Sequence, residues 1–184
     1  MKKFKNLIEA ANDKSSVRGY THRFYNYPGG FSPVFVENAI KTFTKKKDLV
    51  LDPFMGGGTS LIEAVRLNRK IVGIDLNPIA SFVTKVKLSK LSKAQINKIE
   101  LWAFLMSQNL HYKIKTNHFY NEALSLINYK DLGRRDIFNL KTIIKGTSFY
   151  LEKLKETKDK KVKDFLKLLI LRCLHSTLHN TRPI

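Results

Sequence analysis

The chain has 184 residues, 43% of them hydrophobic and 11% aromatic, and its 34 Lys and Arg against 15 Asp and Glu give a formal net charge of +19. The apolar content excludes disorder over the whole length, and no apolar run approaches the roughly 18 residues that span a bilayer. The N-terminus lacks the apolar core of a signal peptide, and the lone Cys173 cannot form an internal disulfide. We therefore expect a soluble, cytoplasmic protein of one domain without a membrane partner.

The positive charge is spread along the chain rather than gathered in a tail. Residues 1–89 carry 15 Lys and Arg against 7 Asp and Glu, a net of +8, and residues 90–184 carry 19 against 8, a net of +11. Lysine and arginine neutralise phosphates and release counterions, so the charge favours a nucleic acid as partner. A lysine-rich, solvated surface is the alternative that charge alone leaves open.

The first third of the sequence predicts two helices separated by an aromatic loop. Apolar residues recur at helical spacing in residues 1–12. Residues 13–33 interleave Gly, Pro and Ser with aromatic side chains, which is loop composition. Pro33 then opens a helix over residues 33–43.

Residues 48–87 predict a βαβ unit. Apolar runs at 48–52 and 70–76 have strand composition, and residues 60–68 between them have helical spacing. Pro78 opens a further helix, and the two strands are expected to be parallel with a right-handed crossover. The crossover helix offers an apolar face made of Leu61, Ala64, Val65 and Leu67.

The rest of the chain predicts helices, at 92–110 with Ser92 as its cap, at 131–157 and at 160–179. The expected organisation is a single α/β domain over 1–184, with a βαβ portion at 1–90 and a helical portion at 91–184. Two parallel strands are too few for an independently stable sheet. We therefore expect the sheet to be completed from elsewhere.

The turn after the first strand carries the chemistry. It reads DPFMGGGTS from Asp52 to Ser60. Glycines permit a sharp turn and the close approach of a ligand, and the helix that follows supplies unpaired amide groups. Asp75 stands at the tip of the second strand, where a carboxylate can accept both hydroxyls of a ribose. Together these features predict a nucleoside site.

Three residues narrow the kind of nucleoside. Gly58 is not followed by the lysine of a Walker phosphate loop, and Leu61 stands where a dinucleotide-binding loop has its third glycine. Asp52 would repel a pyrophosphate but could hold an ammonium group. A ligand with a ribose at one end and a cationic amine at the other is S-adenosylmethionine, which we expect as the cofactor.

Residues 51–80, LDPFMGGGTSLIEAVRLNRKIVGIDLNPIA, closely resemble the cofactor-binding segment of the DNA amino-methyltransferases, which methylate adenine N6 or cytosine N4. The family's DPFxGxGTT loop is matched except at Ser60, and Asp75, Asn77 and Pro78 also fit. The similarity is strong over about residues 20–87, because residues upstream of the loop resemble the segment that lines the methionine end of the cofactor. These residues are His22, Tyr27, Pro28, Gly29, Phe31 and Pro33. The resemblance implies a Rossmann-like methyltransferase fold, DNA as partner and a role in restriction-modification.

The resemblance also implies how the cofactor is held. Residues 52–60 would cradle the methionine and sulfonium region, Asp75 would hold the ribose, and residues 27–31 would close over the cofactor. The expected cofactor-binding residues are Tyr27, Pro28, Gly29, Phe31, Asp52, Pro53, Phe54, Met55, Gly56, Gly57, Gly58, Thr59, Ser60, Asp75, Leu76 and Asn77.

One family motif is missing. These enzymes activate the amine with Asp, Asn or Ser, then Pro-Pro, then an aromatic residue, and this chain contains no Pro-Pro. In members with this segment order the motif follows just after the point where this sequence stops. We therefore expect the cofactor half of a methyltransferase, inactive alone, whose catalytic half is either lost or supplied by a second chain. No catalytic residue is named, and the choice of adenine or cytosine stays open.

Two other functions remain as alternatives: a non-enzymatic basic nucleic-acid-binding protein with a decayed nucleotide fold, and an RNA methyltransferase. A metal is not expected, because His111, His118, His175 and His179 lack an HExxH pattern and a second cysteine. Cys173 is interpreted as a buried small hydrophobe and Trp102 as a core residue. Residues 134–135 and 158–163 are either phosphate contacts or solvated helix ends.

Overall fold

The computed structural model describes residues 2–13, 19–27, 29–108 and 134–180. They lie in two compact units, one within Met1–Lys90 and the other within Leu91–Ile184. None of the described helices combines the length and the apolarity that a bilayer crossing needs.

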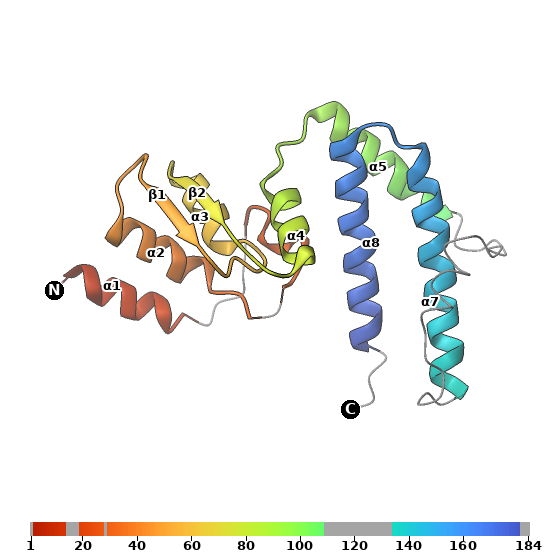
Figure 1. Ribbon diagram of the computed structural model, residues 1–184, viewed down its shortest axis with the longest axis horizontal. Coiled ribbons are helices and arrows are strands. Elements are labelled where there is room, and N and C mark those ends of the chain that lie inside the picture. The colour runs from red at the N-terminus through yellow and green to blue at the C-terminus, as the bar shows by residue number, and fades with distance from the viewer. Residues whose placement is uncertain (1, 14–18, 28, 109–133, 181–184) are drawn as a thin grey trace. The chain divides into compact units, whose positions relative to one another are not determined.

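The first unit contains a strand–helix–strand–helix succession preceded by two helices. Its elements are α1 (Lys2–Ala11), η1 (His22–Phe24), α2 (Pro33–Phe43), β1 (Leu49–Asp52), α3 (Thr59–Arg66), β2 (Lys70–Gly73) and α4 (Pro78–Leu88) (Figure 1). The strands pair in parallel, with Leu49 opposite Lys70 and Asp52 opposite Gly73. The predicted βαβ order is therefore confirmed, with α3 as the crossover.

The second strand ends at Gly73, three residues before the predicted end at Leu76. Ile74 continues the ladder through its backbone alone, because its N–H donates to the Asp52 carbonyl at 2.9 Å and its carbonyl accepts from Met55 N–H at 3.0 Å. Gly73 lies tightly between neighbours, since a Cβ there would lie 2.6 Å from the Met55 Sδ and would also overlap Leu61. The chain thus leaves the sheet at the point where Leu61 of α3 and Met55 of the loop pack against Gly73.

The two faces of the sheet differ in their cover. One face packs against α2 and α3 through a cluster of Val36, Ile40, Val50, Ala64 and Ile71. On the other, which we call the outer face, Leu49, Leu51 and Val72 are 61%, 58% and 42% exposed. Parallel sheets normally have both faces covered, so the described part of the sheet agrees with an incomplete α/β core.

The buried face of α3 includes the predicted Leu61 and Ala64 but not the predicted Val65. Val65 is exposed, whereas Leu61, Ile62 and Ala64 are buried together with Glu63. The difference arises because the segment around η1 also covers α3, on the side where Glu63 lies and hydrogen-bonds His22.

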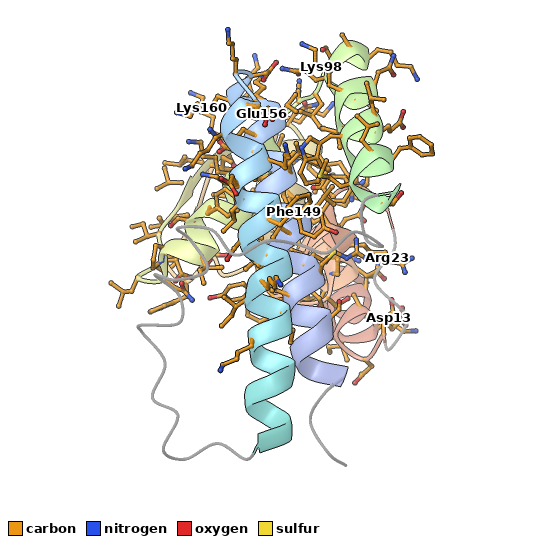
Figure 2. The ribbon with its side chains drawn as sticks, turned by 90° about the vertical axis from the view of Figure 1, so that its right-hand side faces the viewer. Asp13, Arg23, Lys98, Phe149, Glu156 and Lys160 are labelled. Atoms are coloured by element: carbon orange, nitrogen blue, oxygen red, sulfur yellow. The ribbon has the colours of Figure 1, made fainter. Side chains whose placement is uncertain are left out.

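The described part of the second unit contains α5 (Lys93–Gln108), α7 (Arg134–Lys153), η4 (Leu154–Glu156) and α8 (Lys160–Asn180). Figure 2 shows Glu156 and Lys160 on either side of the turn from η4 to α8. The predicted cap of α5 is confirmed as a reciprocal pair, because Ser92 Oγ accepts from Gln95 N–H at 3.2 Å and Gln95 Oε1 accepts from Ser92 N–H at 3.0 Å.

The second unit has its own apolar core. The buried residues are Ile99, Leu154, Val162, Leu166 and Ile170. Trp102 packs against this core as predicted, with its ring centroid 6.0 Å from that of Tyr150. Cys173, predicted to be buried, is exposed. The packing stripe of α8 advances in steps of four from Val162 to Leu174, and Cys173 lies beside it.

Candidate functional site

Two carboxylates lie at the same edge of the sheet. Asp52 is the last residue of β1, and Asp75 follows β2 by two residues. Parallel strands bring their carboxyl ends together, and in α/β sheets ligands bind beyond this edge. Asp52 Oδ1 accepts from Phe54 N–H at 3.1 Å. Its Oδ2 accepts no hydrogen bond within the described residues, so it is available to a donor from outside.

Asp75 braces the glycine loop. Its Oδ2 accepts from Gly56 N–H at 2.9 Å and its Oδ1 from Asn77 N–H at 2.8 Å. A carboxylate offers about four acceptor sites, so each oxygen can still accept from a hydroxyl. Asp75, which the sequence predicts to bind the ribose, therefore keeps the capacity to accept hydrogen bonds from its hydroxyls. The brace on Gly56 is a second role that the sequence analysis did not foresee.

The glycines of the loop are required by conformation and by space. Gly56 and Gly58 have φ values of +47° and +78°, in the left-handed region that favours glycine. A Cβ on Gly57 would lie 2.7 Å from the Tyr27 Cβ, and one on Gly58 would lie 2.6 Å from the Thr84 Cγ2. No side chain larger than hydrogen fits at either position without displacing Tyr27 or Thr84.

Helix α4 supports the loop with two side chains. Thr84 Oγ1 donates to the Gly56 carbonyl at 3.0 Å, and Lys87 Nζ donates to the Gly57 carbonyl at 3.1 Å. Thr84 and Lys87 are 3% and 5% exposed. Burial lowers the pKa of Lys87 to about 8, because it disfavours the charged ammonium. Sequence reasoning missed both residues, although their spacing of three places them on one side of the helix that follows the loop.

The upstream segment reaches the loop through Tyr27. Its ring lies against Gly56 and Gly57, and its hydroxyl accepts from Asn77 Nδ2 at 3.0 Å. Asn77 in turn caps α4, since its Oδ1 accepts from Ile79 N–H at 2.9 Å. The structure thus brings together three parts of the predicted site: Tyr27, the glycine loop and Asn77.

The other upstream residues of the predicted site differ in their exposure and in how close they lie to the glycine loop. Gly30, their neighbour, lies beside the loop, with its ideal Cβ position 3.8 Å from Thr59 Oγ1. Gly29 has a φ of +75°, and no atom lies within 4 Å of its ideal Cβ position. Phe31 is largely exposed, and its ring lies 6.2 Å from that of Phe35. Pro28 lies outside the described residues.

A buried hydrogen bond between His22 and Glu63 anchors the upstream segment. His22 Nε2 and Glu63 Oε1 are 2.8 Å apart, and both side chains are 3% exposed. Arg66 bonds Glu63 Oε2 at 2.7 Å and Glu37 Oε2 at 2.6 Å, and its guanidinium lies 5.2 Å from the centroid of the Tyr20 ring. The hydrogen bond from Arg66 holds the pKa of Glu37 below its usual value. The network fixes the upstream segment to α2 and α3.

Apolar side chains and unpaired amides border the two carboxylates. Phe54 lies two residues after Asp52 and is 86% exposed, and Leu76 directly follows Asp75 and is 100% exposed. Within the described part of the chain, the amides of Gly57, Thr59 and Ser60 have no acceptor. The edge therefore combines two acceptor carboxylates, free amide donors and apolar surface, which are the elements of a site for a nucleoside with a charged tail.

The described residues offer no group of three or more His, Cys, Asp or Glu that could hold a metal ion. His111 and His118 lie outside them.

Comparisons with known proteins show which family the chain resembles. Residues 3–85 match the profile of a family described as DNA methylase. The chain is 30% identical to the type II methyltransferase M.MjaII of Methanocaldococcus jannaschii, over 59% of this chain and 20% of that protein. It is 31% identical to M.BsoBI of Geobacillus stearothermophilus, over 73% of this chain and 28% of that protein. No solved structure matches the chain.

Similarity extends beyond the first unit. The type II methyltransferase M.MvaI of Kocuria varians is 24% identical over 96% of this chain, which includes most of the helical unit, and over 40% of its own length. The chain thus spans less than half of the length of each of these three relatives.

Proposed function

We propose that this chain, which belongs to the DNA methylase family through residues 3–85, forms the S-adenosylmethionine-binding part of a DNA methyltransferase that modifies an exocyclic amine, adenine N6 or cytosine N4. The observation that carries the proposal is the placement of Asp52 and Asp75 at the carboxyl edge of the sheet, where Asp75 also binds the glycine loop. The relatives are named type II methyltransferases, which supports DNA as the macromolecular partner.

The residues present fit this cofactor. Asp75, with one free acceptor site on each oxygen, suits the ribose hydroxyls. Asp52, whose Oδ2 is open, suits the ammonium of the methionine end, and the free loop amides suit its carboxylate. Phe54 and Leu76 offer apolar surface for the adenine ring. When bound, the cofactor supplies the methyl group, and these residues bind and orient it.

The amine activator must come from outside these 184 residues. The sequence holds no Pro-Pro motif, and methyl transfer to a base requires the base to leave the helix stack and meet such a group. We propose that a further polypeptide segment carries that motif, on the same protein or on a second chain.

The direct test is calorimetric titration of the chain with S-adenosylmethionine. Asp75→Asn should lose at least about tenfold in affinity, because an amide cannot serve both backbone donors and a ribose hydroxyl. The matched control is Asp48→Asn, an exposed carboxylate at the opposite end of β1, which should bind as the wild type does. A folded wild-type chain that does not bind the cofactor contradicts the proposal.

The net charge of +19 favours a second candidate, a nucleic-acid-binding protein without enzymatic function. It predicts salt-sensitive DNA binding that is unchanged in Asp75→Ala, together with no binding of S-adenosylmethionine by the wild type. Cofactor binding by the wild type removes this candidate.

A further inference from the structure

Two consecutive carbonyls of the glycine loop point to one helix. Thr84 and Lys87 stand three residues apart on α4 and donate to the carbonyls of Gly56 and Gly57. The two contacts join residues 28 and 30 positions apart in the chain. They therefore fix the orientation of two adjacent peptide groups at the centre of the loop from a rigid element.

The orientation of these carbonyls determines where the loop amides are available. A peptide group whose carbonyl is bonded to α4 directs its N–H to the opposite side. The amides that have no acceptor within the described residues belong to Gly57, Thr59 and Ser60, and they include the peptide group that follows the Gly56 carbonyl. The Thr84 contact thus leaves the Gly57 N–H to a ligand. The peptide group held by Lys87 has its Gly58 N–H bonded to the Met55 carbonyl at 2.7 Å, so Lys87 secures the turn that precedes the free amides of Thr59 and Ser60.

We propose that Lys87 is a positioning residue for the cofactor loop: its buried amine holds the Gly57 carbonyl, and cofactor affinity depends on this hydrogen bond. The inference rests on the proposed function and deepens it, since it assigns a role in cofactor binding to a residue that need not touch the cofactor.

A merely structural role is a poor account of a lysine at this place. A lysine residue that is 5% exposed carries an ammonium that is costly to bury, and a methionine of similar length would fill the space without that cost. The amine donates to the Gly57 carbonyl, and the ideal Cβ position of Gly57 lies 3.5 Å from the amine and 2.7 Å from the Tyr27 Cβ. Burial is the cause that lowers the pKa of Lys87, with no carboxylate contributing.

The charge state of Lys87 makes the role measurable by pH. The pKa near 8 means that the amine is largely protonated at pH 7 and largely neutral at pH 9. Hydrogen bonds from a charged donor are roughly twice as strong as those from a neutral one. The hold on Gly57 therefore weakens as the pH rises through 8, and the affinity for the cofactor falls with it.

The experiment measures S-adenosylmethionine affinity by calorimetry at pH 7 and pH 9. At pH 7, Lys87→Met should lose about tenfold, and its affinity should respond less to pH than that of the wild type. The control is Lys85→Met, an exposed lysine on the same helix, which should behave as the wild type at both pH values. Titration of the cofactor itself is common to all variants and cancels in the comparison. Equal affinities of Lys87→Met and Lys85→Met at pH 7 overturn the proposal and leave the proposed function intact.

A second measurement separates this inference from the proposed function. Amide hydrogen exchange of residues 54–60 in the ligand-free chain should be faster in Lys87→Met than in Lys85→Met, whether or not the cofactor binds. If the wild type binds no cofactor, the proposed function fails, and the loop exchange alone decides the role of Lys87. If Lys87→Met does not fold, exchange in the wild type at pH 7 and pH 9, corrected for chemical exchange, decides. Unchanged protection then overturns the inference.

Discussion

The glycine loop and the outer face of the sheet lie a few residues apart and are organised in opposite ways. In the loop, Asp75 after β2 and Thr84 and Lys87 on α4 hold the backbone by hydrogen bonds. On the outer face, Leu49, Leu51 and Val72 are largely exposed. The comparison teaches that rigidity at the proposed site comes from side chains that bind backbone groups, and not from the burial of the sheet beneath it.

The largest effect is expected from Gly58→Ala, which disturbs the backbone of the glycine loop. The left-handed φ of +78° and the overlap with Thr84, 2.6 Å from the added Cβ, act together. We expect a loss of about 3–4 kcal/mol in the free energy of unfolding and loss of cofactor binding, by analogy with overpacked and strained sites. Chemical denaturation measures the first and calorimetry the second. The control, Gly146→Ala in α7, has open space around it and should gain up to about 1 kcal/mol.

Burial of Lys87 gives the loop a stability cost with a definite pH dependence. The pKa falls from 10.5 to about 8 on folding, so the unfolded chain binds the proton more tightly. The cost is fully present below pH 8 and disappears as the pH rises from 8 towards 10.5. Relative to Lys87→Met, the wild type should therefore gain up to about 3 kcal/mol over this range. Denaturation at pH 7.5 and pH 10 checks the sign, and a gain by the mutant on raising the pH contradicts it.

The next largest effect is expected when the contacts that hold the upstream segment to α3 are weakened. Glu63→Gln replaces a carboxylate that is 2% exposed and serves both His22 and Arg66. We expect a loss of about 2 kcal/mol in the free energy of unfolding and a more mobile Tyr27, detected as faster exchange in the amides around it. Glu9→Gln, an exposed site on α1, should change stability by less than about 0.5 kcal/mol.

The smallest effect compares the two faces of the sheet directly. Val50→Thr places a hydroxyl on the face covered by α2 and α3, and should cost about 1–2 kcal/mol. Val72→Thr makes the same change on the outer face, where the side chain is 42% exposed, and should cost less than about 0.5 kcal/mol in this chain alone. Equal costs, measured by denaturation, would show that something covers the outer face in solution.

The sequence was sufficient for features that depend on local pattern. The order of β1, α3 and β2 follows from apolar periodicity, and the loop follows from three consecutive glycines after a strand. The cap at Ser92 follows from a four-residue signature. Each of these is determined by residues close together in the chain, so composition and spacing are enough to find it.

The sequence was insufficient where distant contacts decide. Lys87 is one of 34 basic residues, and only its contact with Gly57, 30 positions away, distinguishes it. Glu63 was hidden within an ordinary amphipathic helix, and its partner His22 is 41 positions away. Val65 and Cys173 were wrongly predicted to be buried, because helical periodicity locates an apolar stripe but does not show how wide it is or which elements pack against it.

The outer face also bears on how this chain behaves as a colloid. Its apolar side chains favour self-association, while a formal charge of +19 makes the molecules repel one another. Repulsion of this kind is screened within about 3 Å at 1 M salt and reaches about 30 Å at 0.01 M. Solubility of the isolated chain is therefore expected to be greatest in dilute buffer and to decline with added salt, until a polyanion neutralises the charge or a polypeptide covers the strands.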